Sequence, residues 1–341
     1  MEEDHEVSTK DVAVETVRGP RPISELGRVL SHEHVVMLSD WNQLEYPEFA
    51  FPEGRDAAVR KINTRLKELK AAGIDSMIDC TACGHGRDIA LLAEANRDVD
   101  FNIVVSTGIY TYDELPFPFK RFGPGPGEGR EQDLMARMFL KDIREGIAGS
   151  GIKAGAIKVC TDRQGVTPNI DRILRVAAVV HRMTGVPITT HTNAAGKVGL
   201  DQQRIFAEEG VDLACVTIGH SGDSSDLDYL RSLMEAGSMI GADRFGFVMP
   251  GQPGLDQRVA TVAALVRDGF ADRIVLSHDA TIHTDWWPDD PERSGFPADW
   301  TQLLIPQEVL PRLAKAGVSE ADIEKMLVAN PARWLAPVSP Y

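Results

Sequence analysis

The sequence has few cysteines and no long apolar runs. Four cysteines in 341 residues are too few for a disulfide scaffold, and the pair Cys80 and Cys83 lacks the second pair of a structural zinc site, so we interpret them as core or pocket-wall residues. No stretch approaches the ~20 apolar residues that cross a bilayer. The acidic first ten residues lack the basic and apolar regions of a signal peptide. These absences favour a cytoplasmic protein.

Basic residues are also scarce relative to acidic ones. The chain has 36 Lys and Arg against 51 Asp and Glu, a net charge of −15. Binding to nucleic acid depends largely on cations that neutralise phosphates, and anionic membrane surfaces are disfavoured for the same reason. We therefore expect neither partner, and a small molecule is the expected ligand.

Short β-branched runs alternate with segments of helical spacing along the chain. Continuous apolar strands separated by helices indicate a parallel sheet, and several strand ends follow one another at about 30 residues, the size of one βα unit. The eight expected strands lie near residues 26–31, 74–79, 101–107, 154–159, 186–190, 214–219, 238–242 and 273–277. Eight such units predict an α/β fold of the (β/α)8, or TIM, barrel type.

The helical segments and the ends of the chain complete the expected domain. Residues 56–72 place Ala58, Ile62, Leu66 and Leu69 on one stripe. Further helices are expected at 168–183, at 223–236 with Asp223 as a possible N-cap, and at 301–315 and 319–329, the last ending at Asn330-Pro331. We expect residues 1–11 to form a disordered acidic tail and residues 12–337 to form a single barrel domain.

Two segments are predicted to be long loops. Residues 115–130 hold four prolines and four glycines, which predicts a mobile loop over the barrel mouth rather than a phosphate-binding loop, because no GK[ST] follows and proline lacks a backbone donor. Residues 281–300 follow the eighth expected strand and carry three of the five tryptophans. Such a loop would overhang the carboxyl-terminal face, where barrel enzymes keep their active sites.

Histidines recur where the expected strands end. His32 and His34 are two residues apart, which places both imidazoles on the same side of a strand. A lone histidine at a strand end is more often a packing residue than a ligand. Four on one barrel face, with a carboxylate, instead indicate a metal site. The other two histidines, His191 and His220, follow later strands, and the carboxylate is that of Asp279; His278 is not assigned as a ligand.

Lys158 ends the fourth expected strand on the same face. Four neutral imidazoles and one carboxylate leave nothing anionic to bridge two divalent ions, and a protonated lysine cannot ligate. Carboxylated by CO2, Lys158 would be an anionic carbamate able to contact both ions. The alternative is a structural or phosphate-binding lysine.

In this order and at these separations, the motifs HEH, IKV, THT, IGHSGDS and SHDA resemble the amidohydrolase superfamily, in particular the phosphotriesterase family and its phosphotriesterase-like lactonase branch. The resemblance extends from about Val17 to about Asn330. It implies a binuclear metal centre at the carboxyl-terminal face of the barrel. His32, His34 and Asp279 would bind the more buried ion, His191 and His220 the more exposed one, and carboxylated Lys158 would bridge them with a hydroxide whose proton Asp279 takes. The ions would be zinc, or cobalt, manganese or iron, and the protein a homodimer.

Further motifs favour the lactonase branch. GIYTY resembles a pattern in which Tyr110 reaches the metal centre and Tyr112 lines the pocket, although Tyr112 could also be a packed aromatic residue. DRFG resembles the lactonase DRYG, whose arginine is here Arg244, and Asp223 matches a relay aspartate or caps a helix. The implied catalytic residues are Asp279, Tyr110, Arg244 and Asp223. The expected substrate contacts are Tyr110, Tyr112, Arg244 and His283, while His85 is a further histidine of the barrel mouth.

The sequence also departs from the lactonase pattern. Phe245 replaces a tyrosine, residues 247–254 lack the usual aspartate, and the residues after Asp279 lack a common cysteine pair. We therefore expect hydrolysis of lactones, such as N-acyl homoserine lactones, by attack of a metal-bridging hydroxide, with slower hydrolysis of organophosphate triesters. The alternatives are a related binuclear hydrolase that acts mainly on triesters or on another carboxylic ester, and a non-catalytic barrel.

Overall fold

The computed structural model describes residues 12–125, 127–289 and 291–341, so the tail expected at residues 1–11 lies outside the described residues. The main sheet is parallel and runs in the order β10-β9-β8-β7-β6-β5-β4-β3-β11. Its strands are β3 (Val29–Met37), β4 (Ser76–Asp79), β5 (Asn102–Gly108), β6 (Ala156–Thr161), β7 (Ile188–Thr192), β8 (Val216–Ile218), β9 (Met239–Ala242), β10 (Ile274–Leu276) and β11 (Thr281–Thr284). A short antiparallel pair, β1 (Ala13–Val14) and β2 (Arg21–Pro22), precedes them. Strands in chain order with helices between them confirm the predicted (β/α)8 barrel.

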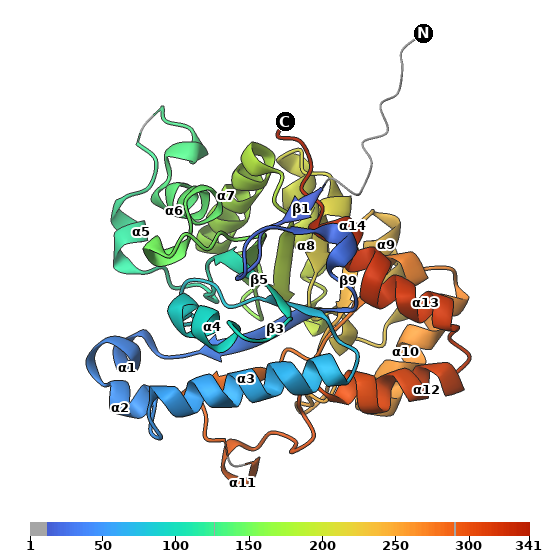
Figure 1. Ribbon diagram of the computed structural model, residues 1–341. Helices are drawn as coiled ribbons and strands as arrows, with labels where there is room; N and C mark the ends of the chain where they lie inside the picture. Colours follow the sequence, from blue (N-terminus) through green and yellow to red (C-terminus); the bar gives the residue numbers. More distant parts are fainter. Residues whose placement is uncertain (1–11, 126, 290) are drawn as a thin grey trace.

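Helices surround the strands in Figure 1. They are α1 (Asp40–Glu45), α2 (Pro47–Ala50), α3 (Arg55–Ala71), α4 (Ile89–Ala95), α5 (Phe117–Arg121), α6 (Leu134–Arg144), α7 (Pro168–Thr184), α8 (Gly199–Glu208), α9 (Leu227–Glu235), α10 (Leu255–Arg267), α11 (Pro291–Ser294), α12 (Leu310–Lys315), α13 (Glu320–Glu324) and α14 (Asn330–Leu335). The buried residues of α3 are the four of the predicted stripe, because apolar residues three and four apart face the sheet together. None of the helices in the described ranges is both long and apolar enough to span a bilayer.

The barrel closes through an eighth strand in two pieces. β10 ends at Leu276, and after an irregular turn the chain resumes as β11, which pairs in parallel with β3. Within the turn, the Asp279 amide donates to the His32 carbonyl at 3.0 Å. The His34 amide donates to the Ala280 carbonyl, also at 3.0 Å. The interruption takes the backbone at Asp279 out of the regular sheet, while the pairing of β11 with β3 still closes the barrel.

The end of the barrel at which the strands begin is filled with apolar side chains. One buried cluster combines inward residues of six strands, Val29, Ile78, Val104, Ala156, Met239 and Val275, with Trp334 and Leu335 of α14 and with Val14, Ile23 and Leu26 of the amino-terminal segment. This packing closes one mouth of the barrel. The polar and ionisable residues are left to the carboxyl ends of the strands.

The first strand differs from its expected position. It spans Val29–Met37 rather than residues 26–31, because Leu26 follows a short 3-10 helix and strand pairing begins with Val29 opposite Ser76. His32 and His34 therefore lie within the strand rather than at its end. Their spacing still places both imidazoles on one side, with ring centroids 5.9 Å apart.

The helix expected at 223–236 also begins later. It starts at Leu227, where the Asp226 side chain accepts from the amides of Asp228 and Tyr229 and acts as the N-cap. Asp223 instead ends a 3-10 turn that follows His220. The cap expected at Asp223 is therefore wrong, and its carboxylate remains available to the barrel mouth.

The last predicted helix does not end at Asn330-Pro331. It continues through α14, after the π-helical stretch η9 (Lys325–Ala329). Proline is tolerated there because the wider π turns already interrupt the regular hydrogen-bond ladder. The Asn330 side chain also donates to the carbonyls of Ala271 and Ile274, at 2.8 and 2.7 Å.

The two segments expected as loops are partly regular. Residues 115–130 contain α5, which has Pro118 in its first turn, where no amide donor is required. Residues 281–300 begin with β11 and include α11. The edge offered by β3 explains β11, since Thr281 and His283 pair with His34 and Val36.

Candidate metal centre

The structure brings the six predicted ligand residues to one end of the barrel. Each comes from a strand or from the first few residues after one: β3 supplies two, β6 and β7 supply one each, and the turns after β8 and β10 supply one each. They are buried or nearly buried: His32, His34, Lys158, His191, His220 and Asp279. Carboxyl ends of parallel strands meet at one face, which explains how residues so distant in sequence converge.

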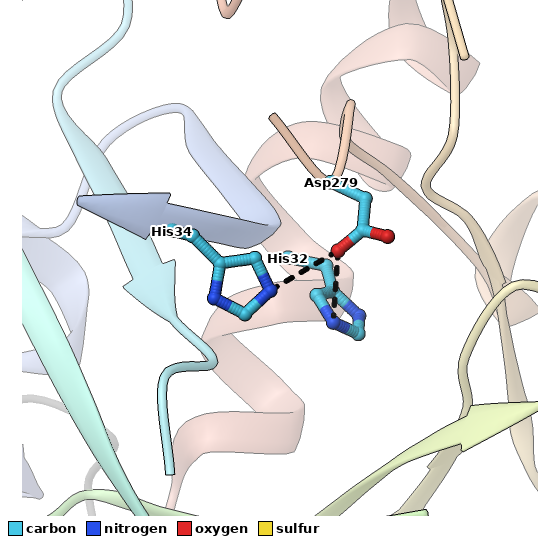
Figure 2. Close-up of side chains that lie close together, drawn as sticks. All are labelled: His32, His34 and Asp279. Carbon is cyan, nitrogen blue, oxygen red and sulfur yellow. Dashed lines mark ion pairs between the residues drawn. The ribbon is translucent and has the colours of Figure 1, made fainter. Parts of the chain in front are cut away.

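Asp279 lies at the middle of the group. Its Oδ1 atom is 3.2 Å from His34 Nε2 and 3.6 Å from His32 Nε2, as Figure 2 shows. Its Oδ2 atom is 3.7 Å from His220 Nε2. The ligand atoms of His32, His34 and Asp279 all lie within 4.8 Å of one another. One divalent ion fits this trio.

Hydrogen bonds on the far side of the rings fix which nitrogen faces the centre. Thr81 donates its hydroxyl to Asp79 at 2.5 Å, so it accepts from His34 Nδ1, 2.8 Å away. The Nδ1 atoms of His32 and His220 lie 3.1 and 3.0 Å from the two oxygens of Asp243. In each ring the proton is then on Nδ1 and the lone pair is on Nε2, as a metal ligand requires.

One buried atom tests whether a metal fits. His220 Nε2 is buried and has no hydrogen-bond partner among the described residues. An unpartnered buried polar atom is costly unless something else satisfies it. A set of neutral imidazole nitrogens and a carboxylate oxygen is typical of zinc and related divalent ions. The donor set therefore fits a metal centre.

Two of the ligand residues have unusual backbone conformations. His220 has φ of 57° and Asp279 has φ of 55°, in the left-handed region that residues other than glycine rarely adopt. Such conformations cost free energy, and they cluster at functional sites where the surroundings hold them. Both turn a side chain into the mouth at the point where a strand ends.

Burial keeps three of the imidazoles neutral. It lowers the pKa of His191 to about 4, and it lowers the pKa values of His32 and His220 well below the usual value. For Asp279, burial alone would raise the pKa, but the nearby guanidinium of Arg244 holds it well below its usual range. Neutral imidazoles and an ionised carboxylate are the forms that bind metal.

Lys158 is 1% exposed, and its Nζ atom lies 2.5 Å from His32 Nε2. Within the described part of the chain no carboxylate forms an ion pair with it. A buried ammonium without an anionic partner is unfavourable.

Next to the ligands lies a chain of paired charges. Arg244 donates from Nε to Asp279 Oδ2 at 2.8 Å and from Nη1 to Asp223 Oδ2 at 2.9 Å. Asp223 also accepts from Arg258 at 2.7 Å and from Gln252 at 2.9 Å. Although burial opposes its charge, the two carboxylates raise the pKa of Arg244. Arg244 therefore joins the centre to Asp223 as a permanent cation.

A cavity of about 210 Å³ opens above the ligand residues. Tyr110, Tyr112 and Arg244 line it, with the two tyrosine hydroxyls 2.6 Å apart. The His85 ring stacks on Tyr110 with centroids 3.8 Å apart. The outer wall is aromatic and consists of Phe247, Trp286, Trp287, Phe296 and Trp300.

The structure does not bring His283 into this cavity. Its ring stacks on Phe51, and its Nε2 atom donates to the Ala50 carbonyl at 3.0 Å. It belongs to a separate surface cleft beside α3. Thr281, on the same face of β11, lines the cavity, so His283 is excluded by its position two residues further along the strand.

Sequence reasoning also misses residues that hold the ligands. Asp243 follows β9 as directly as the assigned residues follow their strands, so a signal was present. Asp162, 3.7 Å from His191 Nε2, follows β6 in the same way. The fully buried Glu33 accepts from His278 Nδ1 at 2.7 Å and from the Ala280 amide at 3.1 Å, which holds the turn that carries Asp279.

A (β/α)8 barrel with such a ligand set at the carboxyl ends of its strands defines a class of metal-dependent hydrolases. A sequence profile of the Phosphotriesterase family matches residues 12–335. The chain belongs to this family.

Relatives in this family cover nearly the whole chain. A Mycobacterium tuberculosis protein named phosphotriesterase homology protein is 46% identical over 321 residues, covering 93% of this chain and 96% of its own. Aryldialkylphosphatase of Saccharolobus solfataricus is 35% identical over 315 residues, covering 92% and 96%. A solved structure described as the phosphotriesterase from Mycobacterium tuberculosis superposes with a TM-score of 0.89 at 43% identity, over 96% of this chain and 100% of that one.

Proposed function

We propose that this phosphotriesterase-family hydrolase opens lactones, such as N-acyl homoserine lactones, and hydrolyses organophosphate triesters more slowly. The observation that carries the proposal is the link from Asp279 through Arg244 to Asp223, beside Tyr110 in one cavity. This arrangement serves a reaction whose leaving group must be protonated.

The proposed centre holds two divalent ions, zinc first among the candidates and cobalt, manganese or iron as alternatives. His32, His34 and Asp279 would hold one ion, His191 and His220 the other, and a carbamate on Lys158 both. When bound, such ions supply Lewis acidity and lower the pKa of water toward neutrality.

Tyr110 and Asp279 have separate roles in this proposal. Burial raises the pKa of Tyr110, so its hydroxyl stays a hydrogen-bond donor at neutral pH and can stabilise the oxygen that becomes negative when a lactone carbonyl is attacked. Asp279 receives the proton of the attacking water and returns it to the departing alkoxide. Arg244 cannot release a proton, so it acts by holding the two carboxylates in place.

The aromatic wall supports an apolar substituent on the substrate. Phe247, Phe296 and Trp300 lie in ring contact, with centroids 4.9 to 5.7 Å apart. Rings of this kind bury an acyl chain, and Tyr112, 41% exposed, lies at the cavity's edge. We therefore expect medium or long acyl chains to be preferred.

Lactones are expected to give a higher kcat/KM than paraoxon-like triesters. A lactone presents one planar carbonyl to one donor and leaves as a poor alkoxide that needs a proton. A panel of lactones of increasing chain length, nitrophenyl triesters and aryl esters would measure this directly. If triesters are the better substrates, the lactonase assignment fails.

A triesterase is the second candidate. The relative from Saccharolobus solfataricus is named for action on aryldialkyl phosphates. Among the departures of this sequence, Phe247 lines the cavity, whereas Phe245 is buried beside it in sequence and does not line it. The same substrate panel distinguishes the two candidates.

We also propose that the protein is a homodimer. Helices α1 and α2, at the left edge of Figure 1, expose large apolar side chains: Trp41 is 74% and Leu44 81% exposed, and Phe49 is 62% exposed. Such a patch is typical of an interaction surface. Light scattering is expected to give about twice the 37.3 kDa of one chain, and Leu44→Glu to shift the mass to one chain. A monomeric wild type would reject this part of the proposal.

A further inference from the structure

One carboxylate contacts histidines from both halves of the proposed centre. Asp243 follows β9 and is 1% exposed. Its Oδ2 atom is 3.1 Å from Nδ1 of His32, which belongs to the trio around Asp279. Its Oδ1 atom is 3.0 Å from Nδ1 of His220, assigned to the second ion. No other carboxylate among the described residues bonds Nδ1 atoms of two of the proposed ligands.

Burial raises the pKa of Asp243, and the neighbouring guanidinium of Arg244 opposes that rise. In its charged form the carboxylate can only accept hydrogen bonds. Both rings must therefore carry their proton on Nδ1, which leaves Nε2 with the free lone pair that a metal needs. The His220 amide also donates to Asp243 Oδ1 at 2.8 Å. Asp243 thus holds the ring of His220 together with its left-handed backbone at φ 57°.

The barrel leaves room for this carboxylate at one glycine. A Cβ atom on Gly241 would lie 2.1 Å from Asp243 Oδ2, far inside van der Waals contact. The side chain folds back over β9 at a position where any larger residue would displace it. The contact of Asp243 with both rings therefore depends on its place directly after β9 and on the missing side chain of Gly241.

We propose that Asp243 is a positioning residue that couples the two metal sites, so that loss of this one carboxylate weakens both. The inference rests on the binuclear centre of the proposed function. Thr81 provides the contrast, since among the proposed ligands it bonds only His34. An outer contact of this kind is typically worth about 10–100-fold in metal affinity.

The test titrates metal-free protein with zinc against a competing chromophoric chelator, without substrate. Asp243→Ala is expected to raise both apparent dissociation constants about 10–100-fold. Asp243→Asn keeps one accepting oxygen, so one ring must move its proton to the nitrogen that would ligate; one site weakens and the other changes little. Thr81→Val, the matched control, is expected to weaken one site only.

Gly241→Ala displaces the carboxylate without removing it and is expected to weaken both sites. It and Asp243→Asn keep the test decisive if Asp243→Ala does not fold, which circular dichroism of the metal-free proteins checks. Asp243→Ala with only one weakened site, or two unchanged sites in Asp243→Asn, would overturn the coupling. The titration measures zinc binding alone, so its result does not depend on whether lactones are substrates. A wild-type protein with only one zinc site would instead refute the proposed binuclear centre.

Discussion

Lys158→Ala is expected to abolish binding of the pair of metal ions and to lower hydrolysis on the order of 10³-fold or more, since Lewis-acid polarisation alone supplies several kcal/mol. Wild-type protein is expected to hold about two divalent ions per chain. Elemental analysis after dialysis and initial rates on one lactone measure both effects. This is the largest single effect that we expect.

The expectation follows from the surroundings of Lys158. Its side chain is fully buried on β6, and its Nζ atom lies 2.5 Å from His32 Nε2. Five of the six ligand residues contribute four neutral rings and one carboxylate. Two divalent ions held by these groups alone would carry an uncompensated charge of three, in a site largely shielded from water. A carbamate adds the missing anion between the ions.

A small carboxylic acid such as acetate or propionate is expected to restore part of the metal and of the rate in Lys158→Ala, because it supplies the anion that alanine lacks. Lys153→Ala is the matched control, since that lysine is partly exposed and pairs with Glu15 away from the centre. A Lys158→Ala protein with two ions and the wild-type rate would refute the bridging role.

Local pattern was sufficient for the fold. The stripe of α3 follows from a rule that acts within a few residues, and the helices expected at 56–72 and 168–183 form within a residue or so of those bounds. The displaced first strand and the helix continued past Pro331 depend on distant partners instead. Val29 is fixed by Ser76, and Asn330 by carbonyls more than 50 residues away. No spacing in one segment carries that information.

The site divides in the same way. Residues that follow strands were predictable as a group, because the carboxyl ends of a barrel converge whatever the details of packing. The turn at Asp279 and the orientation of His283 were not, because both follow from how β11 resumes against β3. Asp243 falls between these cases: its position gave a signal, but its contact with two rings depends on the space above Gly241.

Arg244→Ala is expected to lower kcat/KM for lactones by about 10²-fold, the usual worth of general acid assistance, and for nitrophenyl triesters far less. The two substrates differ in their leaving groups. An alkoxide must be protonated as it departs, whereas a nitrophenolate leaves without a proton. Rates on both substrates, measured on one preparation, give the ratio of the two losses, which shows whether Arg244 assists the departure of the alkoxide.

The structural reason lies in the two carboxylates that Arg244 joins. Without the guanidinium, Asp279 and Asp223 lose the cation between them, while Asp223 keeps Arg258, 2.7 Å away. Asp279 keeps its histidine neighbours, so metal content is expected to stay at the wild-type value. The defect should then appear in proton return rather than in assembly of the centre. Arg244→Lys is expected to lie between alanine and wild type, since an ammonium supplies the charge but not the planar fork that contacts both groups.

Gln252→Ala provides the control for a general disturbance of this region. Gln252 donates to the same Asp223 oxygen as Arg244, at 2.9 Å, but has no contact with Asp279. If Arg244 acts by merely holding Asp223, the two variants should behave alike. If it acts by holding Asp279 for proton return, only Arg244→Ala should separate lactones from triesters. A residue needed only for the leaving alkoxide cannot slow the loss of nitrophenolate. Equal losses on both substrates in Arg244→Ala would therefore refute the lactonase assignment, and the altered residues 245–254 would then be assigned to the recognition of a different substrate.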